Sequence, residues 1–586
     1  MIPDEAQQRH AALSCRGRRL YGRVPLEGGE RRANAFKALG QSLVLLPSPL
    51  HGYGVSTVLS QLPLDSVVIA VELEPDLNLL SVTSPESLLP ALLTSYPEQL
   101  QYFHAPYTQQ LLQEICRKIP THIRRVQLLS LNNGYSLHAE AYRELQQGIE
   151  DELARLWRNR ATTLALGPLW VRNLFRNLPL LATMPRLDTP SKKDSKFGRY
   201  TESSRTSASH ASTDCPRGPV VVVGAGASLE ADIDIIRNVR DQVTLVAADS
   251  ALGPLKGHGI TPDLVVVLEA QPVNREHFLF PANSQPGTEQ EFPFTACDLS
   301  SLPSLARYFA KSGGLFFITR FADISLFERI EQHGLVPATV MPVGSVGVCA
   351  IMLTTQIFSG PIGITGFDSA YSGGLPHTRG AASHRWALRR STRLDQEPLF
   401  TFRYNRRPVA VNGKGDHTYL TEPNLIGSAE RIGELFNSCP RLFDFGSIGL
   451  KLGREVPSTK EAVRAALGIS ASVSDPKSLP AQKEQQTLPH KSNGISKGLV
   501  QTTGLCSFLE TEITLLNAGI KELIKLETGD SEQTTPSAVA KLEYLYFDVS
   551  LAAPTSSAGR RRALLQAYRY KELLEHSLAK FSGESA

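Results

Sequence analysis

The sequence predicts an α/β protein: a Rossmann-like central domain with a mainly parallel sheet, a smaller N-terminal α/β region and a C-terminal helical module. Unbroken apolar runs such as Val220–Val223 indicate strands that are buried on both faces, as in a parallel sheet covered by helices. Helical patterns separate these runs, which is typical of βαβ units. At 586 residues the chain must contain more than one domain, because single cores stop growing at roughly 250–300 residues.

Composition narrows the classes of partner. The 61 Lys and Arg nearly balance the 57 Asp and Glu, so the strong positive field of non-specific nucleic-acid binding is missing. We therefore expect nucleotides, nucleotide sugars or proteins as partners, and no nucleic acid. The seven cysteines show no CxxC spacing, and no metal site or disulfide framework is predicted. Charges interrupt the amino terminus and no apolar stretch is long enough for a membrane span, which predicts a cytoplasmic protein.

The N-terminal region, 1–160, opens with a candidate βαβ unit. Its strands are Ser42–Leu46 and Ser66–Glu74, and a terminal acidic residue is what a ribose-binding unit uses. The loop His51–Gly54 is only a degenerate glycine loop, and tight turns need glycine for geometric reasons alone. We favour that structural interpretation and leave open whether the region binds a ligand. Helical spacing from Leu111 to Arg160 predicts a connecting helix.

Polar stretches divide the remaining chain. Within the central domain, 161–456, the segment 185–218 is rich in Ser, Thr, Lys and Arg and is predicted to be a flexible surface insertion. The segment 457–500 is predicted to be a disordered linker. The C-terminal module, 501–586, begins with apolar residues at three- and four-residue intervals, the pattern of an amphipathic helix. Two further helical segments are expected, around Ser537–Leu551 and Gly559–Phe581.

Three strand ends of the central domain carry small or polar residues. The turn after Val223 holds Gly224 and Gly226, which let backbone amides approach a ligand, and a helix starting near Ser228 would direct its free amides at a phosphate. Later strands end at Asp249 with Ser250 and at Glu269. Because the carboxyl ends of parallel strands meet at one edge, these residues should lie close together.

The pair Gly344 and Ser345 opens another apolar helix. Ser345 is placed like an N-cap, and it is equally suited to a second anion-facing helix start.

In order and spacing, the segments GAGASLE, AADSALGPLKGHGITPDLVVVLE, VGSVGVCA and GFDSAYSGGLPH resemble the central domain of the motility accessory factor flagellin glycosyltransferases. The same superfamily includes the 6-hydroxymethylpterin diphosphokinase MptE-like proteins. The resemblance covers about half of the chain. It implies a fold similar to bacterial CMP-sialyltransferases and transfer of a nonulosonic, sialic-like sugar from a CMP-linked donor to Ser or Thr of flagellin or another surface protein. No further cofactor is expected.

The resemblance also assigns site residues. His377, in a glycine-rich loop, would be the general base, although a loop histidine is often only exposed. Tyr371 would assist the leaving phosphate or merely pack against the sheet edge, and Asp368 would orient Tyr371 or hold a cation. The donor-binding residues carried over are Gly224, Gly226, Ser228, Asp249, Ser250, Glu269, Gly344 and Ser345. The chain departs from the family pattern at Ala227, Glu269 and Phe367, which puts the donor and the activity in question.

Charged residues near these motifs have less specific interpretations. Arg379, Arg385, Arg389 and Arg390 could bind an acidic sugar, but a solvated helix face is the favoured interpretation. Asp232 and Asp234 form a DxD pattern inside a predicted helix and are expected to face solvent, so the pattern does not support a metal site.

Two other functions stay open. One is ATP-dependent pyrophosphoryl transfer of the 6-hydroxymethylpterin diphosphokinase kind, for which Mg²⁺ would be needed. The other is a non-catalytic nucleotide-binding or flagellin-chaperone protein, motivated by Ala227 and Phe367.

Overall fold

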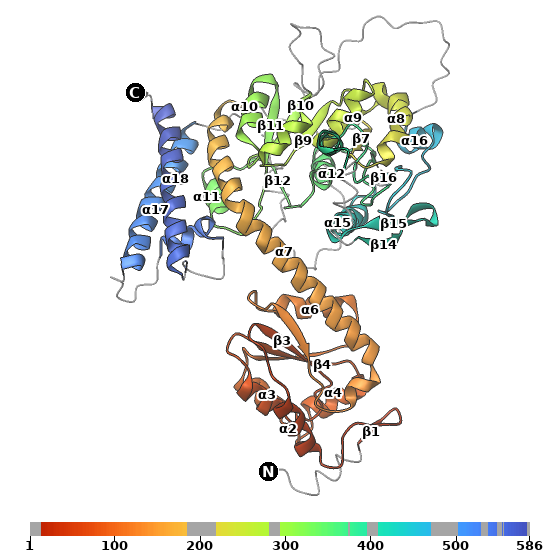
Figure 1. Ribbon diagram of the computed structural model, residues 1–586, viewed down its shortest axis with the longest axis vertical. Helices are drawn as coiled ribbons and strands as arrows, with labels where there is room; N and C mark the ends of the chain where they lie inside the picture. Colours follow the sequence, from red (N-terminus) through yellow and green to blue (C-terminus); the bar gives the residue numbers. More distant parts are fainter. Residues whose placement is uncertain are drawn as a thin grey trace, which may run out of the picture. The chain divides into compact units, whose positions relative to one another are not determined.

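The computed structural model describes residues 13–184, 218–279, 293–372, 375–394, 408–469, 502–528, 537–547, 554 and 556–582 (Figure 1). The chain forms two compact units, Met1–Thr163 and Leu164–Ala586. The insertion predicted at 185–218 and the larger part of the linker predicted at 457–500 lie outside the described residues.

The first unit is a four-stranded parallel sheet with the order β5-β4-β3-β6. Its strands are β3 (Ser42–Pro47), β4 (Val67–Glu72), β5 (Leu100–His104) and β6 (Arg125–Leu128). A small hairpin pairs β1 (Ser14–Cys15) with β2 (Arg18–Arg19). The helices are α2 (Pro25–Ala35), α3 (Val55–Gln61), α4 (Pro75–Val82), α5 (Leu89–Ser95), α6 (Gln109–Lys118), η1 (Gly134–Leu137) and the start of α7 (Ala139–Asn177).

The geometry of the turn between β3 and α3 requires a glycine at position 54. Gly54 caps α3 with a φ of +88°, and a Cβ there would lie 2.6 Å from the carbonyl oxygen of Gly29. Close packing of α2 against α3 thus requires glycine at this position, which supports the interpretation that the loop His51–Gly54 contains glycine for geometric reasons. Glu72, at the end of β4, accepts a 2.8 Å hydrogen bond from the Ser48 hydroxyl and is buried within the unit.

The second unit contains an eight-stranded, wholly parallel sheet with the order β12-β11-β10-β9-β8-β7-β13-β16, which confirms the predicted fold class. Its strands are β7 (Val220–Val223), β8 (Thr244–Ala248), β9 (Leu264–Val267), β10 (Phe294–Asp298), β11 (Gly314–Thr319), β12 (Thr339–Val340), β13 (Ile362–Thr365) and β16 (Leu442–Asp444). From β7 the chain steps outward to β12 and then returns to β13 on the other side. The carboxyl ends of β7 and β13 therefore form the topological switch point, where open α/β sheets bind ligands.

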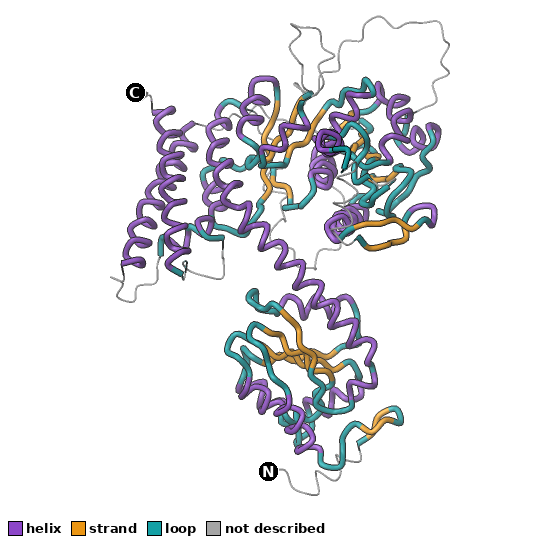
Figure 2. The backbone as a smooth tube through the Cα atoms, in the orientation of Figure 1, coloured by secondary structure: helices purple, strands orange, loops and turns teal. Residues whose placement is uncertain are grey.

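Helices cover both faces of this sheet (Figure 2). The helices of this part of the chain are η2 (Leu178–Ala182), α8 (Ser228–Val239), η3 (Arg240–Gln242), η4 (Asp249–Ala251), α9 (Leu252–Gly257), η5 (Pro272–His277), α10 (Pro303–Ser312), α11 (Leu326–Gln332), α12 (Val346–Ile357), α13 (Ala382–Arg390), η6 (Lys414–Asp416), α15 (Pro423–Ser438) and α16 (Lys460–Ala466). Two further strands, β14 (Val409–Asn412) and β15 (Thr418–Thr421), make an antiparallel hairpin. The first part of the segment predicted as linker is therefore ordered: Thr459 caps α16, and Val463 is fully buried.

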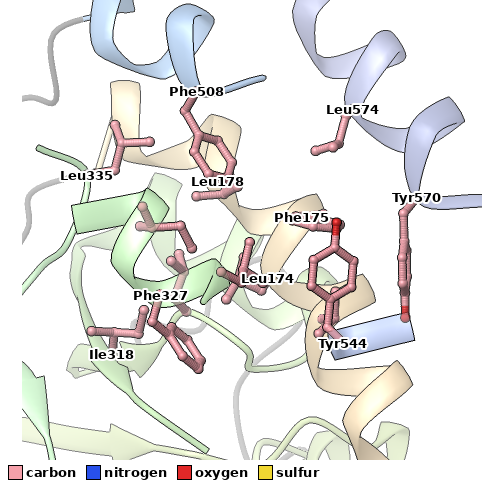
Figure 3. Packing of buried hydrophobic residues seen from close by; sticks show 14 of the residues in the cluster. Leu174, Phe175, Leu178, Ile318, Phe327, Leu335, Phe508, Tyr544, Tyr570 and Leu574 are labelled. Atoms are coloured by element: carbon pink, nitrogen blue, oxygen red, sulfur yellow. The ribbon is translucent and has the colours of Figure 1, made fainter. Parts of the chain in front are cut away.

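The C-terminal helices share a core with the central sheet. The long helices α17 (Thr502–Thr528) and α18 (Ser557–Ser582) pair with each other, and η7 (Val539–Lys541) and η8 (Glu543–Leu545) lie between them in the sequence. Figure 3 shows Tyr544 and Tyr570 beside Phe175 of α7, and Phe508 beside Leu178. These side chains belong to the same buried cluster as Phe327 of α11. The predicted amphipathic stripe is confirmed, but it faces the central domain.

Two asparagines of α7 hold the loops at the carboxyl edge. The Asn173 amide donates to the carbonyl oxygens of Ala270 (3.0 Å) and Ser300 (3.2 Å). The Asn177 amide donates to the carbonyls of Leu299 and Ser301, both at 2.9 Å. The end of α7 thereby fixes the loops that follow β9 and β10.

Candidate functional site

The glycine loop after β7 lies directly against the loop after β13. The Gly224 amide donates to the Thr365 carbonyl (2.9 Å), and the Gly226 amide donates to the Gly366 carbonyl (2.7 Å). A Cβ on Gly226 would lie 2.7 Å from the Asp368 carboxyl carbon and 2.8 Å from the Gly366 oxygen. The two loops approach so closely that only glycine fits, and this contact builds the switch point.

Asp368 fixes the start of α8. Its carboxylate accepts hydrogen bonds from the Ser228 hydroxyl and from the Ser228 amide, the latter at 2.9 Å. The Ser228 oxygen also accepts from the Gly366 amide at 3.2 Å. Burial raises the pKa of Asp368 to about 6, against the lowering effect of the Ser228 hydrogen bonds. Two predicted site residues, one assigned to donor binding and one to catalysis, are thus in direct contact.

A buried charged cluster supports this contact. Lys414 forms a 2.6 Å ion pair with Asp444 and donates to the Gly446 carbonyl at 2.7 Å. Asp232 accepts from the hydroxyls of Thr365 (2.6 Å) and Ser458 (2.5 Å) and has no exposed surface. The expectation that Asp232 faces solvent is therefore wrong, because α8 turns this position toward the sheet; its neighbour Asp234 is exposed.

Hydrogen bonds hold the loop of His377 against the glycine loop and the start of α8. The amide of Thr378 donates to the Ala225 carbonyl at 2.8 Å. Glu230, in the first turn of α8, accepts from the Thr378 hydroxyl (3.1 Å) and from the Arg379 amide (2.8 Å), and it pairs with the Arg379 guanidinium. That pair lowers the pKa of Glu230 to about 2. His377 is thus held at the same edge as Gly224 and Gly226.

His377 is partly buried and lies close to His277. Its Nδ1 is 3.2 Å from the Ser383 hydroxyl of α13. Burial, and to a smaller extent His277, lowers the pKa of His377 to about 4, so the imidazole is neutral at pH 7. His277 also has a pKa of about 4, through burial and the nearby Arg385. His277 could not be singled out from the sequence, because 100 residues separate it from His377.

The end of β8 brings two carboxylates together. Asp249 is almost completely buried, and burial raises its pKa to about 7, to which the Glu269 charge also contributes. The Ser250 amide and the Asn274 side chain stabilise the charged form of Asp249. Glu269 itself accepts from the Gln271 amide at 2.9 Å. Asp249 and Ser250 follow β8, the neighbour of β7, and Glu269 follows β9, so all three lie at the predicted carboxyl edge.

The start of α12 meets the glycine loop through Phe367. A Cβ on Gly347 would lie 2.7 Å from the Phe367 ring, and one on Gly224 would lie 3.1 Å from it. Ser345 stands at the N-cap position of α12, but its side chain makes no capping hydrogen bond. The predicted N-cap position of Ser345 is thus confirmed, and the alternative, an anion-facing helix start, stays a prediction. Nothing lies within 4 Å of where a Cβ on Gly344 would be.

Tyr371 contacts the β14–β15 hairpin and the residue before α15. Its hydroxyl donates to Glu422 at 3.1 Å, and its amide donates to the Leu420 carbonyl of β15 at 2.8 Å. The side chain is buried. These contacts agree with the second of the two roles considered for Tyr371, namely packing.

The arginines of α13 differ in their surroundings. Arg385 donates to the Glu276 carbonyl, and Arg389 pairs with the Glu276 carboxylate at 3.1 Å. Arg390 lies over the ring of Trp386, 4.2 Å from its centre.

Over the described ranges, no three His, Cys, Asp or Glu side chains are grouped closely enough to hold a metal ion. None of the described helices is both long and apolar enough to cross a membrane.

Fold and edge loops together define a Rossmann-like α/β protein with a candidate ligand site at its switch point. Comparison with known proteins agrees with this class. Residues 199–374 match the family model of 6-hydroxymethylpterin diphosphokinase MptE-like proteins, so the predicted resemblance is confirmed for this part of the chain.

Two further similarities extend over more of the chain. A protein of Treponema pallidum (strain Nichols), itself uncharacterized, is 25% identical over 437 residues, which span 74% of this chain and 70% of the relative. The Maf glycosyltransferase of Magnetospirillum magneticum AMB-1 superposes with a TM-score of 0.51 over 98% of this chain and 84% of its own, at 14% identity. The second similarity establishes a shared fold.

Proposed function

We propose that this protein is a glycosyltransferase that binds a nucleotide-linked sugar at the β7/β13 switch point and transfers the sugar to a protein hydroxyl. One observation carries the proposal: the Thr378 amide bonds to the Ala225 carbonyl and thereby holds His377 beside the glycine loop. The glycine loop and a neutral imidazole therefore share one edge of the sheet. The fold shared with a Maf glycosyltransferase supports the same function.

The donor and acceptor follow from the family resemblance. The proposed donor is a CMP-linked nonulosonic acid, and the proposed acceptor is a Ser or Thr of flagellin or another surface protein. Gly224, Gly226 and Ser228 are the donor-binding residues that the resemblance implies. Because their amides already donate to Thr365, Gly366 and Asp368, they would shape the edge at which the phosphate binds and would not bond to it themselves.

In the proposed reaction the acceptor oxygen attacks the anomeric carbon while the bond from that carbon to the phosphate oxygen breaks. The acceptor proton passes to His377, and the nucleotide leaves with the bonding electron pair. A pKa of about 4 makes His377 a weak base in the ligand-free protein. The negative charge of a bound donor would raise that pKa, because an anion nearby favours the imidazolium form.

The direct test is transfer in vitro by the full-length chain. Purified protein, a CMP-linked nonulosonic acid and unglycosylated flagellin should yield flagellin whose mass is increased by the sugar, measured by mass spectrometry. His377→Ala should lower turnover by roughly a hundredfold, as for loss of a general base. An unchanged flagellin mass together with no binding of CMP would refute the proposal.

The family match favours one alternative, because the matching model is named for 6-hydroxymethylpterin diphosphokinase. Under that alternative the chain would consume ATP in the presence of hydroxymethyldihydropterin and Mg²⁺, and the strand-end carboxylates Asp249 and Glu269 are candidates to hold the metal. A coupled assay for AMP release distinguishes it from sugar transfer.

A non-catalytic nucleotide-binding or flagellin-chaperone role is the remaining alternative, since Phe367 occupies the space between the glycine loop and α12. A rise in melting temperature with CMP or ATP, without turnover of either, would favour it.

A further inference from the structure

The first unit contains a hollow that the proposed function does not use. It has a volume of about 480 Å³ and lies between the start of β6 and the middle of α7. Its lining residues are Arg124, Arg125, Val126, Glu150, Leu153, Ala154 and Trp157. Because Arg125 is the first residue of β6, the hollow lies at the amino end of the sheet. Ligands of Rossmann-like sheets bind at the opposite, carboxyl end, so this is a surface of a different kind.

Trp157 gives the hollow a fixed aromatic wall. Its indole Nε1 donates a 2.6 Å hydrogen bond to the Ile123 carbonyl, which sets the orientation of the ring. The guanidinium carbon of Arg124 lies 4.6 Å from the ring centre, and that of Arg160 lies 4.8 Å from it. A guanidinium held over an aromatic ring keeps its in-plane N–H groups available to a carboxylate.

The charge of the hollow is positive. Arg124 and Arg125 are both exposed, and in the part of the chain that the structure describes neither guanidinium has an ion pair. The lining contains one carboxylate, Glu150, which accepts a 2.8 Å hydrogen bond from Gln146. Two guanidinium groups without a carboxylate partner among the described residues, beside an apolar wall of Val126, Leu153 and Trp157, suit a ligand that combines negative charge with apolar groups.

The sheet edge indicates that this ligand is a polypeptide. β6 is an edge strand: it pairs with β3 on one side, and among the described strands none pairs with its other side. An extended segment can hydrogen-bond along such an edge and place alternate side chains toward a neighbouring hollow. A small anion would use the arginines but neither the edge nor the apolar wall.

We propose that the hollow and the β6 edge bind an extended acidic segment of another polypeptide. Arg124 and Arg125 would pair with its carboxylates, and Trp157 would pack against its apolar side chains.

The test uses the full-length protein and a fluorescein-labelled peptide that alternates glutamate and valine, followed by fluorescence anisotropy. Binding should weaken with added NaCl, because exposed charges are screened. The double variant Arg124→Ala/Arg125→Ala should lose about tenfold or more in affinity, since two charge-assisted contacts disappear. Arg158→Ala is the matched control. This exposed arginine lies on α7, which lines the hollow, but is not itself part of the lining, so the variant should bind the peptide as tightly as the unchanged protein does.

The proposal would be overturned if the glutamate–valine peptide did not bind, or if the double variant bound it as tightly as the unchanged protein does. Binding of a lysine–valine peptide with the same affinity as the glutamate–valine peptide would also overturn it. Complete competition by pyrophosphate at the peptide's own concentration would also overturn it, because the site would then recognise a small anion. None of these outcomes depends on glycosyl transfer, so the proposal can fail while the proposed function stands.

Discussion

The ion pair between Arg329 and Glu512 joins the C-terminal helices to the central sheet, and its removal gives a quantitative prediction. Arg329 of α11 donates from Nε to Glu512 Oε2 at 2.7 Å and from Nη2 to Oε1 at 2.9 Å. Tyr544 adds a 2.6 Å hydrogen bond to Oε1. The side chain of Glu512 is fully buried and that of Arg329 is 13% exposed. Arg329→Met would leave a buried carboxylate without its counter-charge.

Breaking one side of a buried pair costs about 3–5 kcal/mol. The second unit spans about 420 residues, and the entropy of unfolding is about 2.1 cal/mol/K per residue, so each kcal/mol shifts the melting temperature by about 1 °C. We therefore expect the melting temperature of Arg329→Met to fall by about 3–6 °C. The assay is thermal and urea unfolding of the full-length chain, followed by circular dichroism. The double variant Arg329→Met/Glu512→Leu should recover most of the loss, because it removes the unpaired charge as well.

Arg320→Met is the matched control. Arg320 pairs with Glu331 at 2.6 Å, but both side chains are more than one third exposed, at 40% and 46%. Exposed pairs contribute about 0–1 kcal/mol, so this variant should unfold almost like the unchanged protein. Equal losses in Arg329→Met and Arg320→Met would refute the argument that burial sets the cost.

Three further predictions concern the candidate site. Asp249→Asn removes a carboxyl whose pKa is about 7 in the folded protein and 3.8 in the unfolded chain. Between these pH values the folded state binds more protons than the unfolded state, so the stability of the unchanged protein falls as the pH rises. In urea unfolding, its stability advantage over the variant should therefore shrink from pH 4 to pH 7. A pH-independent difference would contradict the assigned burial. Asp368→Asn places an amide NH₂ group, or a weaker acceptor, against Ser228. In the same assay it should lower the free energy of unfolding by about 1–3 kcal/mol. No change would mean that the contact with Ser228 adds no stability. Gly226→Ala puts a Cβ 2.7 Å from the Asp368 carboxyl, so calorimetry should show weaker CMP binding than for the unchanged protein; unaltered affinity would remove the glycine loop from the binding site.

The sequence predicts the parts of the fold that depend on local pattern. The run Val220–Val223 forms a buried central strand, and α8 begins at Ser228, as the glycine turn indicates. Apolar periodicity also predicts the buried face of α17. It cannot predict that this face packs on the central domain, because amphipathicity does not specify a partner.

The contacts that complete the site are not visible in the sequence. Glu230 pairs with Arg379 and Lys414 pairs with Asp444, in each case between separate elements of the fold. Asp232 looks like a surface residue because polar helix positions usually face water, yet Thr365 and Ser458 satisfy its carboxylate in the interior.

The central claim is that the switch point binds a nucleotide-linked sugar while His377 acts in the chemical step. Its most direct test is calorimetric titration of CMP and a CMP-linked nonulosonic acid into the unchanged full-length chain and into His377→Ala, with sugar transfer measured in parallel. Both proteins should bind the donor with similar affinity, and turnover of the variant should fall by roughly a hundredfold. Loss of donor binding in His377→Ala to the same extent as loss of turnover would contradict the central claim, because His377 would then be a donor contact and not the base.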